Sequence, residues 1–356
     1  LGVAWLLRVA SDGSDDVAMP AAKSVRATIE LDPNLQMEGE DGSAIALSAD
    51  GELLAIVARD VRDGSQALYR RPLSGTRFER IAGTDDATDP TFSPDGRHLV
   101  FNWNSYADFR IPVNGGSRTQ LGPGSNFSKA WTANDSIVYA ESYASGLSIR
   151  SAAGGPSRTL TEPESDQGVL GHWHPDVVDG TPWVLYTRYS TPGDSSRIVA
   201  YSRATGEHRT IARGARYSQW SRSGHVLFVR QTQLFALPVD PATMEAIGPS
   251  TSILPDMAMD ATDGFSQFAI SDDGTFVYMD REEATPRGRL AIIRRDGTVE
   301  PLDVASQSYG IPRLSPDGRH LAVTFGEPQR DVWIVELERG AMSRVTFDPA
   351  TEFGGV

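Results

Sequence analysis

The chain has 356 residues, of which 39% are hydrophobic and 22% are charged, so it is long enough to bury a large core. Its 34 glycines and 22 prolines exceed what long helices tolerate and favour strands joined by tight turns. A formal net charge of -14 argues against nucleic acid as a partner, because phosphate backbones are polyanions. The absence of cysteine excludes disulfides, thiolate metal sites and a cysteine nucleophile.

The N-terminal segment is strongly apolar. Residues 1–7 have the sequence LGVAWLL and precede Arg8, after which Ser, Asp, Gly and Ala dominate. Seven residues are too few to cross a bilayer, so we interpret residues 1–7 as the remnant of a transmembrane helix whose beginning is missing. Residues 8–24 are then a flexible linker, since their composition cannot bury enough apolar surface to fold. The alternative is a frayed, hydrophobic N-terminus of a soluble protein.

A four-residue turn recurs through the chain every 39 to 50 residues. Residues 93–96 and 315–318 are both SPDG, and close or weaker copies occur at residues 48–51, 132–135, 177–180, 221–224 and 271–274. Ser, Pro, Asp and Gly supply the local hydrogen bonds and backbone angles that a tight turn requires, so this serine is predicted to be structural and not catalytic. An alternating apolar run follows each turn and predicts a strand.

Each repeat has a second turn, rich in Gly or Pro, between an apolar and a polar strand. These turns lie at residues 74–75, 114–116, 154–155, 205–206, 240–241, 296–297 and 339–340. Two hairpins per repeat make a four-stranded unit, and such units in series are typical of β-propeller blades. Paired β-sandwiches are the competing architecture, but they do not require the same turn chemistry seven times.

The sequence therefore predicts an all-β fold, a β-propeller of about seven four-stranded blades, with six or eight as alternatives and with the chain truncated at both ends. The propeller is predicted to occupy residues 25–346, where residues 25–31 add an outer strand to one blade. Residues 347–356 are predicted to start a further, truncated repeat.

The repeats resemble those of TolB-type, WD-repeat-like β-propellers, with Phe92 before the SPDG turn and closings such as residues 160–161 and 345–346. An ordered series of less common segments narrows the likeness; these are residues 25–31, 68–73, 81–84, 112–116, 224–227 and 234–240. The series looks like the extracytoplasmic propeller of bacterial transmembrane serine/threonine protein kinases.

This resemblance implies a periplasmic propeller, anchored in the membrane through an N-terminal helix, with a kinase domain on the cytoplasmic side. The chain itself has no Gly-rich loop, His-Arg-Asp or Asp-Phe-Gly motif, so no phosphorylation activity is assigned to it. We expect a non-catalytic sensor or protein-interaction module that binds a protein, peptide or envelope ligand and needs no cofactor. The alternative is the propeller of a prolyl-oligopeptidase-like hydrolase, or a propeller enzyme with its site at the channel mouth, although no Gly-x-Ser-x-Gly elbow is present.

Two histidines are the most obvious candidates for metal binding. His172 and His174 are two residues apart on a predicted innermost strand, where alternation places both side chains on one face. No third ligand with a recognisable metal spacing accompanies them, so a packed or hydrogen-bonded pair is favoured over a metal site.

Acidic clusters and tryptophans also have structural interpretations. The carboxylates of Asp85, Asp86 and Asp89, and of Asp256, Asp260 and Asp263, have the short spacing found around calcium, but neither group fits the twelve-residue calcium loop. They are predicted to be solvated loop residues. Trp131, Trp220 and Trp333 lie in or beside apolar runs and are predicted to pack between blades.

A ligand site is expected at the mouth of the central channel, because the first strand of each blade borders it. The polar and aromatic residues predicted there are Lys129, His172, His174, Arg216, Tyr217, Gln219, Gln267, Tyr309 and Arg313. Their mixture suits recognition of a small molecule or peptide. The alternative is that they only bond exposed backbone and water.

Overall fold

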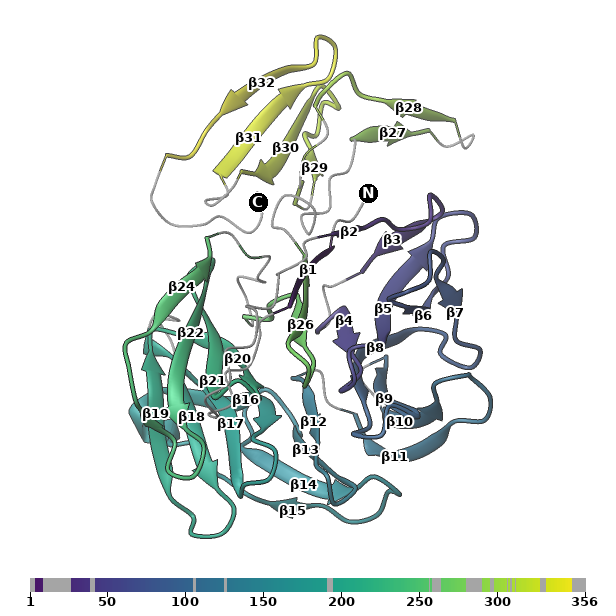
Figure 1. The fold of residues 1–356 in the computed structure, drawn as a ribbon. Helices are drawn as coiled ribbons and strands as arrows, with labels where there is room; N and C mark the ends of the chain where they lie inside the picture. Colours follow the sequence, from purple (N-terminus) through teal and green to yellow (C-terminus); the bar gives the residue numbers. More distant parts are fainter. Residues whose placement is uncertain are drawn as a thin grey trace. The chain divides into compact units, whose positions relative to one another are not determined.

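The computed structural model describes residues 4–8, 27–38, 42–104, 107–124, 127–190, 195–255, 257, 264–279, 290–294, 298–305, 307, 309–310, 312–326 and 331–347. The chain divides into two compact units, Leu1–Ala284 and Thr285–Val356. Strands dominate both units, as predicted (Figure 1). A short helical turn, η1 (Ser165–Gln167), precedes the fourth repeat's first strand. No described helix is long and apolar enough to cross a membrane.

The first unit is a β-propeller whose described strands form six antiparallel sheets, here called blades 1 to 6. Blades 1 to 3 contain β3 (Leu35–Met37), β4 (Ile45–Leu47), β5 (Leu53–Asp60), β6 (Gln66–Pro72) and β7 (Glu79–Arg80); β8 (Ala87–Phe92), β9 (His98–Trp103), β10 (Ala107–Pro112) and β11 (Thr119–Pro123); and β12 (Lys129–Trp131), β13 (Ser136–Ala140), β14 (Leu147–Ser151) and β15 (Arg158–Thr159).

Blades 4 to 6 complete the ring. They contain β16 (Val169–Val177), β17 (Trp183–Ser190), β18 (Arg197–Ser202) and β19 (His208–Arg213); β20 (Arg216–Ser221), β21 (His225–Arg230), β22 (Gln233–Asp240), β23 (Glu245–Ala246) and β24 (Thr251–Leu254); and β25 (Phe268–Ile270), β26 (Thr275–Met279), β1 (Ala4–Arg8) and β2 (Thr28–Ile29). Each blade packs on the next through its innermost strand, and β25 of blade 6 contacts β4 of blade 1. Strands β7, β11, β15 and β19 lie at the periphery (Figure 1).

The repeated turn is held by its own side chains, which explains its recurrence. Ser93 Oγ donates to Asp95 Oδ1 at 2.6 Å and accepts from the backbone N–H of His98 at 2.9 Å. Gly96 has φ 68°, a left-handed angle that costs glycine nothing. In the fourth repeat the turn begins at Val178, whose carbonyl accepts from Thr181 N at 3.2 Å, one residue later than predicted.

Apolar faces of neighbouring blades make the core. Leu54 and Leu68 of blade 1 belong to the same buried cluster as Leu99 and Phe101 of blade 2. Further clusters lie between the later blades, as between Val184 of blade 4 and Val138 of blade 3. The alternating apolar runs of the sequence are therefore the faces on which the blades pack.

Blade 6 differs from the sequence-based expectation. The segment interpreted as the end of a transmembrane helix contains strand β1, which pairs antiparallel along β26 from Ala4 opposite Met279 to Arg8 opposite Thr275. An extended apolar segment can satisfy the unpaired N–H and C=O groups at the edge of β26. The predicted outer strand within residues 25–31 is present as β2, which pairs with β1. Residues 9–24 of the predicted linker lie outside the described residues.

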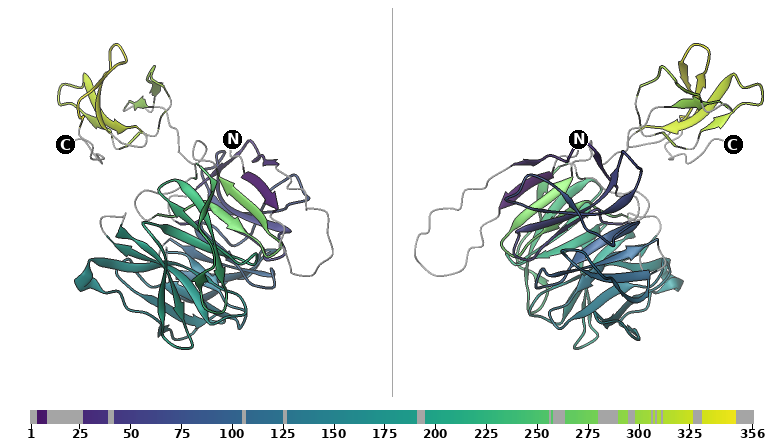
Figure 2. Two further views of the ribbon diagram at one scale, coloured as in Figure 1. Left: turned by 60° about the vertical axis from the view of Figure 1, so that its left-hand side comes forward. Right: turned by 90° about the vertical axis from the view of Figure 1, so that its right-hand side faces the viewer.

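The second unit holds β27 (Ala291–Ile293) paired with β28 (Val299–Pro301), and a four-stranded sheet of β29 (Arg313–Leu314), β30 (His320–Phe325), β31 (Asp331–Glu336) and β32 (Ala341–Arg344) (Figure 2). This sheet is the seventh four-stranded repeat. The second hairpin of the sixth repeat, β27–β28, forms its own sheet in this unit, because β1 occupies the edge of β26. The described ring thus has six blades, and the predicted propeller segment 25–346 is divided at Ala284. Residues 348–356 lie outside the described residues.

Candidate functional site

Four innermost strands share a backbone irregularity. The register of β8, β16 and β20 shifts around Asp89, His174 and Tyr217, whose φ angles are 52°, 52° and 47°. Ser128, directly before β12, has φ 60°. Each of these residues lies four positions before the first residue of its repeated turn. A left-handed angle costs a non-glycine residue about 1–2 kcal/mol, so blades 2 to 5 each store strain at one equivalent position.

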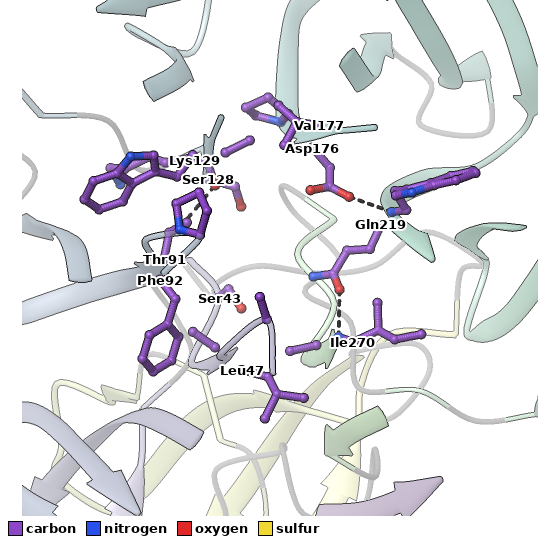
Figure 3. Close-up of a pocket in the computed structure, with 18 of the residues that line it drawn as sticks. Ser43, Leu47, Thr91, Phe92, Ser128, Lys129, Asp176, Val177, Gln219 and Ile270 are labelled. Carbon is purple, nitrogen blue, oxygen red and sulfur yellow. Dashed lines mark hydrogen bonds between the residues drawn. The ribbon is translucent and has the colours of Figure 1, made fainter. Parts of the chain in front are cut away.

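These four residues line a cavity of about 260 Å³ on the axis of the ring. Side chains from β4, β8, β12, β16, β20 and β25 contribute to its wall. Figure 3 shows Asp176 and Gln219 on one side of the cavity and Thr91, Ser128 and Lys129 on the other. The cavity lies at the innermost strands, where the sequence analysis expected a ligand site.

Part of the polar wall joins neighbouring blades. Thr91 Oγ1 donates to the carbonyl of Lys129 at 3.2 Å, and Asp176 Oδ2 accepts from the backbone N–H of Trp220 at 2.6 Å. Gln219 Oε1 accepts from Ile270 N at 3.2 Å (Figure 3). Thr91, Asp176 and Gln219 all lie two positions before a repeated turn, and each bonds the innermost strand of the next blade. These three side chains bond backbone groups of the next blade, and such bonding was the alternative to ligand recognition in the sequence analysis.

A buried charge network joins blades 2 and 3. Lys129 Nζ lies 2.7 Å from Asp89 Oδ2 and 3.4 Å from Asp108 Oδ1, and Asp108 also pairs with Arg150. All four side chains are withdrawn from solvent. Burial alone would lower the pKa of Lys129, but the charges of Asp108 and Asp89 outweigh it and raise the pKa. Lys129 is therefore a charged, fixed part of the cavity wall.

One part of the cavity wall, here called its inner end, consists of the buried polar residues His174, Tyr217, Ser128 and Ser218. Burial, assisted by Arg216, lowers the pKa of His174 to about 3, so its imidazole is neutral at physiological pH. Burial raises the pKa of Tyr217 to about 12, although hydrogen bonds with Ser43 and Gln219 oppose the shift. In the described structure, His174 Nε2, Ser128 Oγ and Ser218 Oγ have no hydrogen-bond partner. Buried polar atoms of this kind need a partner, which a ligand can supply.

The outer end of the cavity is acidic. Asp176, Asp179, Asp272 and one cation, Arg222, line it. Arg222 Nη2 lies 2.9 Å from Asp272 Oδ2 and 3.4 Å from Asp179 Oδ2. Burial raises the pKa of Asp176 to about 7; the hydrogen bond from Trp220 opposes the shift, and the charges of Asp179 and Asp272 add to it. The Arg222 guanidinium thus pairs with Asp179 and Asp272, whereas Asp176 is held by the backbone of Trp220.

The predicted site residues divide into those that line the cavity and those that do not. Lys129, His174, Tyr217 and Gln219 line it. Arg216 and Gln267 are neighbours outside the lining: the Arg216 guanidinium lies 5.2 Å from the Tyr189 ring, and the Gln267 amide bonds Ala44 N and Gly42 O.

The other three predicted residues lie elsewhere. His172 Nδ1 lies 2.8 Å from Thr161 Oγ1, and its ring packs on Tyr186, so it does not share a site with His174. The bulge at His174 breaks the alternation on which the shared face was predicted. Tyr309 and Arg313 belong to the second unit.

The metal and packing predictions can be compared with the described residues. Asp85 pairs with Arg80 at the surface, whereas Asp89 is buried beside Lys129, so the first acidic cluster does not converge. Asp256, Asp260 and Asp263 lie outside the described residues. Within the described ranges no group of three His, Asp or Glu side chains could hold a metal ion.

The predicted packing of the tryptophans agrees with a buried Trp131 and with Trp220 and Trp333 lying against apolar clusters.

Sequence reasoning missed most of the outer end of the cavity. Asp176, Asp179, Arg222 and Asp272 were not singled out, and Asp89 was considered only for calcium. A signal was present, because cavity residues occupy fixed positions, two and four residues before each repeated turn.

The sequence matches no protein-family model and no curated protein. Among solved structures, the chain is similar to the putative TolB from Agrobacterium tumefaciens, with a TM-score of 0.54 and 15% identity, over 78% of this chain and 97% of that one. For TolB from Acinetobacter baumannii the TM-score is 0.51 and the identity 13%, over 75% of this chain and 65% of the Acinetobacter protein. The fold is that of a TolB-like β-propeller.

An enzyme shares this propeller fold as well. Oligogalacturonate lyase from Vibrio parahaemolyticus is similar with a TM-score of 0.51 and 12% identity, over 92% of this chain and 96% of the lyase. At such identities the likeness concerns the fold alone, because one propeller scaffold carries unrelated functions.

Proposed function

We propose that this TolB-like propeller is a non-catalytic recognition module that binds a ligand in its axial cavity. The observation that supports this most directly is the combination of strain and unpartnered polar atoms at one place. Ser128 and His174 both have left-handed backbone angles and both leave a buried polar atom unbonded at the cavity. Backbone strain of this kind clusters at binding sites and active sites.

We further propose that the module is the extracytoplasmic sensor of a membrane-bound serine/threonine protein kinase. The support is the ordered series of segments that resembles the propellers of such kinases. A rigid ring loses little ordering entropy on binding, so ligand occupancy can be converted into altered proximity of attached domains. The reading frame upstream of Leu1 tests this part: it should encode a transmembrane helix and a kinase domain with Gly-rich, His-Arg-Asp and Asp-Phe-Gly motifs.

A ligand screen by thermal shift tests the recognition role. The purified chain is screened against peptides and cell-envelope fragments, and a ligand at 100 times its Kd should stabilise the ring by about 2.7 kcal/mol. Tyr217→Phe removes a hydroxyl from the cavity and should weaken binding, whereas Tyr309→Phe, in the second unit, should not.

Two outcomes would overturn the assignment. If the Tyr217→Phe variant binds the ligand as tightly as the Tyr309→Phe variant and the parent chain do, the axial cavity is not the site. If no probe shifts the unfolding temperature, and deletion of residues 25–346 from the full-length protein leaves kinase output unchanged, the sensor role is wrong.

A second candidate function is an enzyme with its active site in the same cavity. The observation in its favour is Asp176, whose pKa of about 7 is close to that of an efficient general acid or base, near His174 and Tyr217. A screen of polysaccharide lyase and hydrolase substrates tests this candidate. Turnover that is abolished by Asp176→Asn would replace the binding role with a catalytic one.

A further inference from the structure

The acidic end of the cavity has an unbalanced charge. Four carboxylates line the cavity as a whole, and its two cations are already engaged: Lys129 with Asp89, and Arg222 with Asp179 and Asp272. Asp176 has no cationic partner among the described residues and is held by the backbone N–H of Trp220. An additional positive charge beside Asp176 would therefore offset the repulsion of its carboxylate by those of Asp179 and Asp272.

The inner end of the cavity offers acceptors for N–H groups. The side chains of His174, Ser218 and Ser128 are 1%, 2% and 8% exposed, and each leaves a polar atom without a partner in the described structure. Both hydroxyl oxygens can accept hydrogen bonds, and the imidazole nitrogen accepts in one of its two neutral tautomers. This observation is independent of the carboxylates and points to the same ligand chemistry.

The walls between the two ends include apolar surface. Val177, Ile270 and Ala269 line the cavity beside the carboxylates. The volume of about 260 Å³ has room for an extended alkyl chain and not for a folded domain.

We propose that the cavity binds a primary ammonium group carried on an alkyl chain, with Asp176 as its main counter-ion. The proposal rests on the recognition role inferred above and specifies its ligand. The lysyl side chain of a peptide and a free aliphatic diamine share this chemistry. A carboxylate paired with an ammonium in a partly desolvated cavity forms a charge-assisted hydrogen bond, while the alkyl stem packs on the apolar wall.

Isothermal titration calorimetry with three probes tests the proposal: acetyl-Gly-Lys-Gly-amide, the same peptide with an acetylated lysine side chain, and 1,5-diaminopentane. The lysyl peptide should bind at least about tenfold more tightly than its acetylated form, because a hydrogen bond between charged groups is lost. Binding by the peptide and not by the diamine identifies a peptide ligand, and binding by both identifies the amine as sufficient.

Three variants locate the site. Asp176→Asn should weaken binding about tenfold, and Asp85→Asn, which makes the same change of charge outside the cavity, should not. Arg222→Gln removes the competing cation and should strengthen binding about threefold, a gain that damage to the fold cannot produce. The Asp176 carboxylate accepts from Trp220 N and is affected by the charges of Asp179 and Asp272, while Arg222 pairs with those two carboxylates. Its pKa of about 7 also predicts binding about tenfold weaker at pH 6 than at pH 8.

The failures are distinguishable. If the acetylated peptide binds as tightly as the lysyl peptide, or Asp176→Asn binds as tightly as the parent chain, the ammonium proposal is wrong. If both cations fail to bind while the thermal-shift screen still yields a ligand lost in Tyr217→Phe, only this proposal is overturned. If that screen fails too, the recognition role is overturned with it.

Discussion

Lys129 and Asp89 form an ion pair of 2.7 Å between adjacent blades, and neither side chain is exposed to solvent. In Lys129→Met the carboxylates of Asp89 and Asp108 would remain buried without this cation, so we expect a loss of about 3–5 kcal/mol in the free energy of unfolding. Chemical denaturation measures the loss. Arg80→Met is the control, because the Arg80–Asp85 pair is equally short at 2.6 Å but exposed, and should cost less than about 1 kcal/mol. Equal losses of stability in Lys129→Met and Arg80→Met would contradict the conclusion that burial makes the Lys129–Asp89 pair the more important one.

Ser128 provides a test of the strain around the cavity. Its φ of 60° is unfavourable for serine and accessible to glycine, and its hydroxyl has no partner among the described residues. Ser128→Gly should therefore stabilise the ring by about 0.5–1 kcal/mol, after allowance for the greater entropy of unfolded glycine. Ser128→Ala also removes the unpaired hydroxyl but keeps the strain, so it should be less stable than Ser128→Gly. Calorimetric unfolding temperatures that rank Ser128→Ala above Ser128→Gly would contradict the interpretation.

Two buried histidines predict acid sensitivity. Burial lowers the pKa of His172 to about 4 and that of His174 to about 3, below the ordinary value of 6.5. Below pH 6.5 the unfolded chain binds protons that the folded chain does not, so stability is lost as the pH falls from 6.5 toward 4. Each histidine contributes up to about 1.4 kcal/mol per pH unit.

Denaturant unfolding of His174→Gln at pH 5 and pH 6.5 measures this contribution. The variant should show a shallower pH dependence than the parent chain, whatever its absolute stability. An unchanged slope would show that the imidazole of His174 is accessible to protons in the folded state.

The sequence predicted the local features of the fold and not its pairing choices. Turns such as residues 93–96 and 315–318 are determined by their own side chains, so seven repeats were recognisable. The edge of β26 pairs with β1, a segment remote in the sequence, whereas β27 pairs with β28. Local sequence patterns carry no information on such long-range pairing. The seven repeats could therefore be counted from the sequence, whereas the number of blades in the ring could not.

The same distinction applies to the site. Lys129, His174, Tyr217 and Gln219 line the cavity, and the sequence pointed to them because propeller blades present their first strand to the axis. His172 was misplaced because strict alternation was assumed across a strand that contains a bulge. The importance of Asp176 depends partly on Asp272, which lies in the turn of another blade and meets Asp176 only in the folded ring.

Asp176 should make the ring less stable in alkali than in mild acid. Its pKa is raised to about 7 in the folded state from an ordinary value of 3.8, so its contribution to stability is complete below pH 3.8 and is lost as the pH rises through 7. Asn can still accept the hydrogen bond from Trp220 and carries no charge. Asp176→Asn should therefore unfold at a higher temperature than the parent chain at pH 8, and this difference should be clearly smaller at pH 5. Asp85→Asn, an exposed control, should show no such difference between the two pH values. A variant that is less stable at pH 8 than at pH 5, relative to the parent chain, would mean that the ionised carboxylate is favoured in the folded ring.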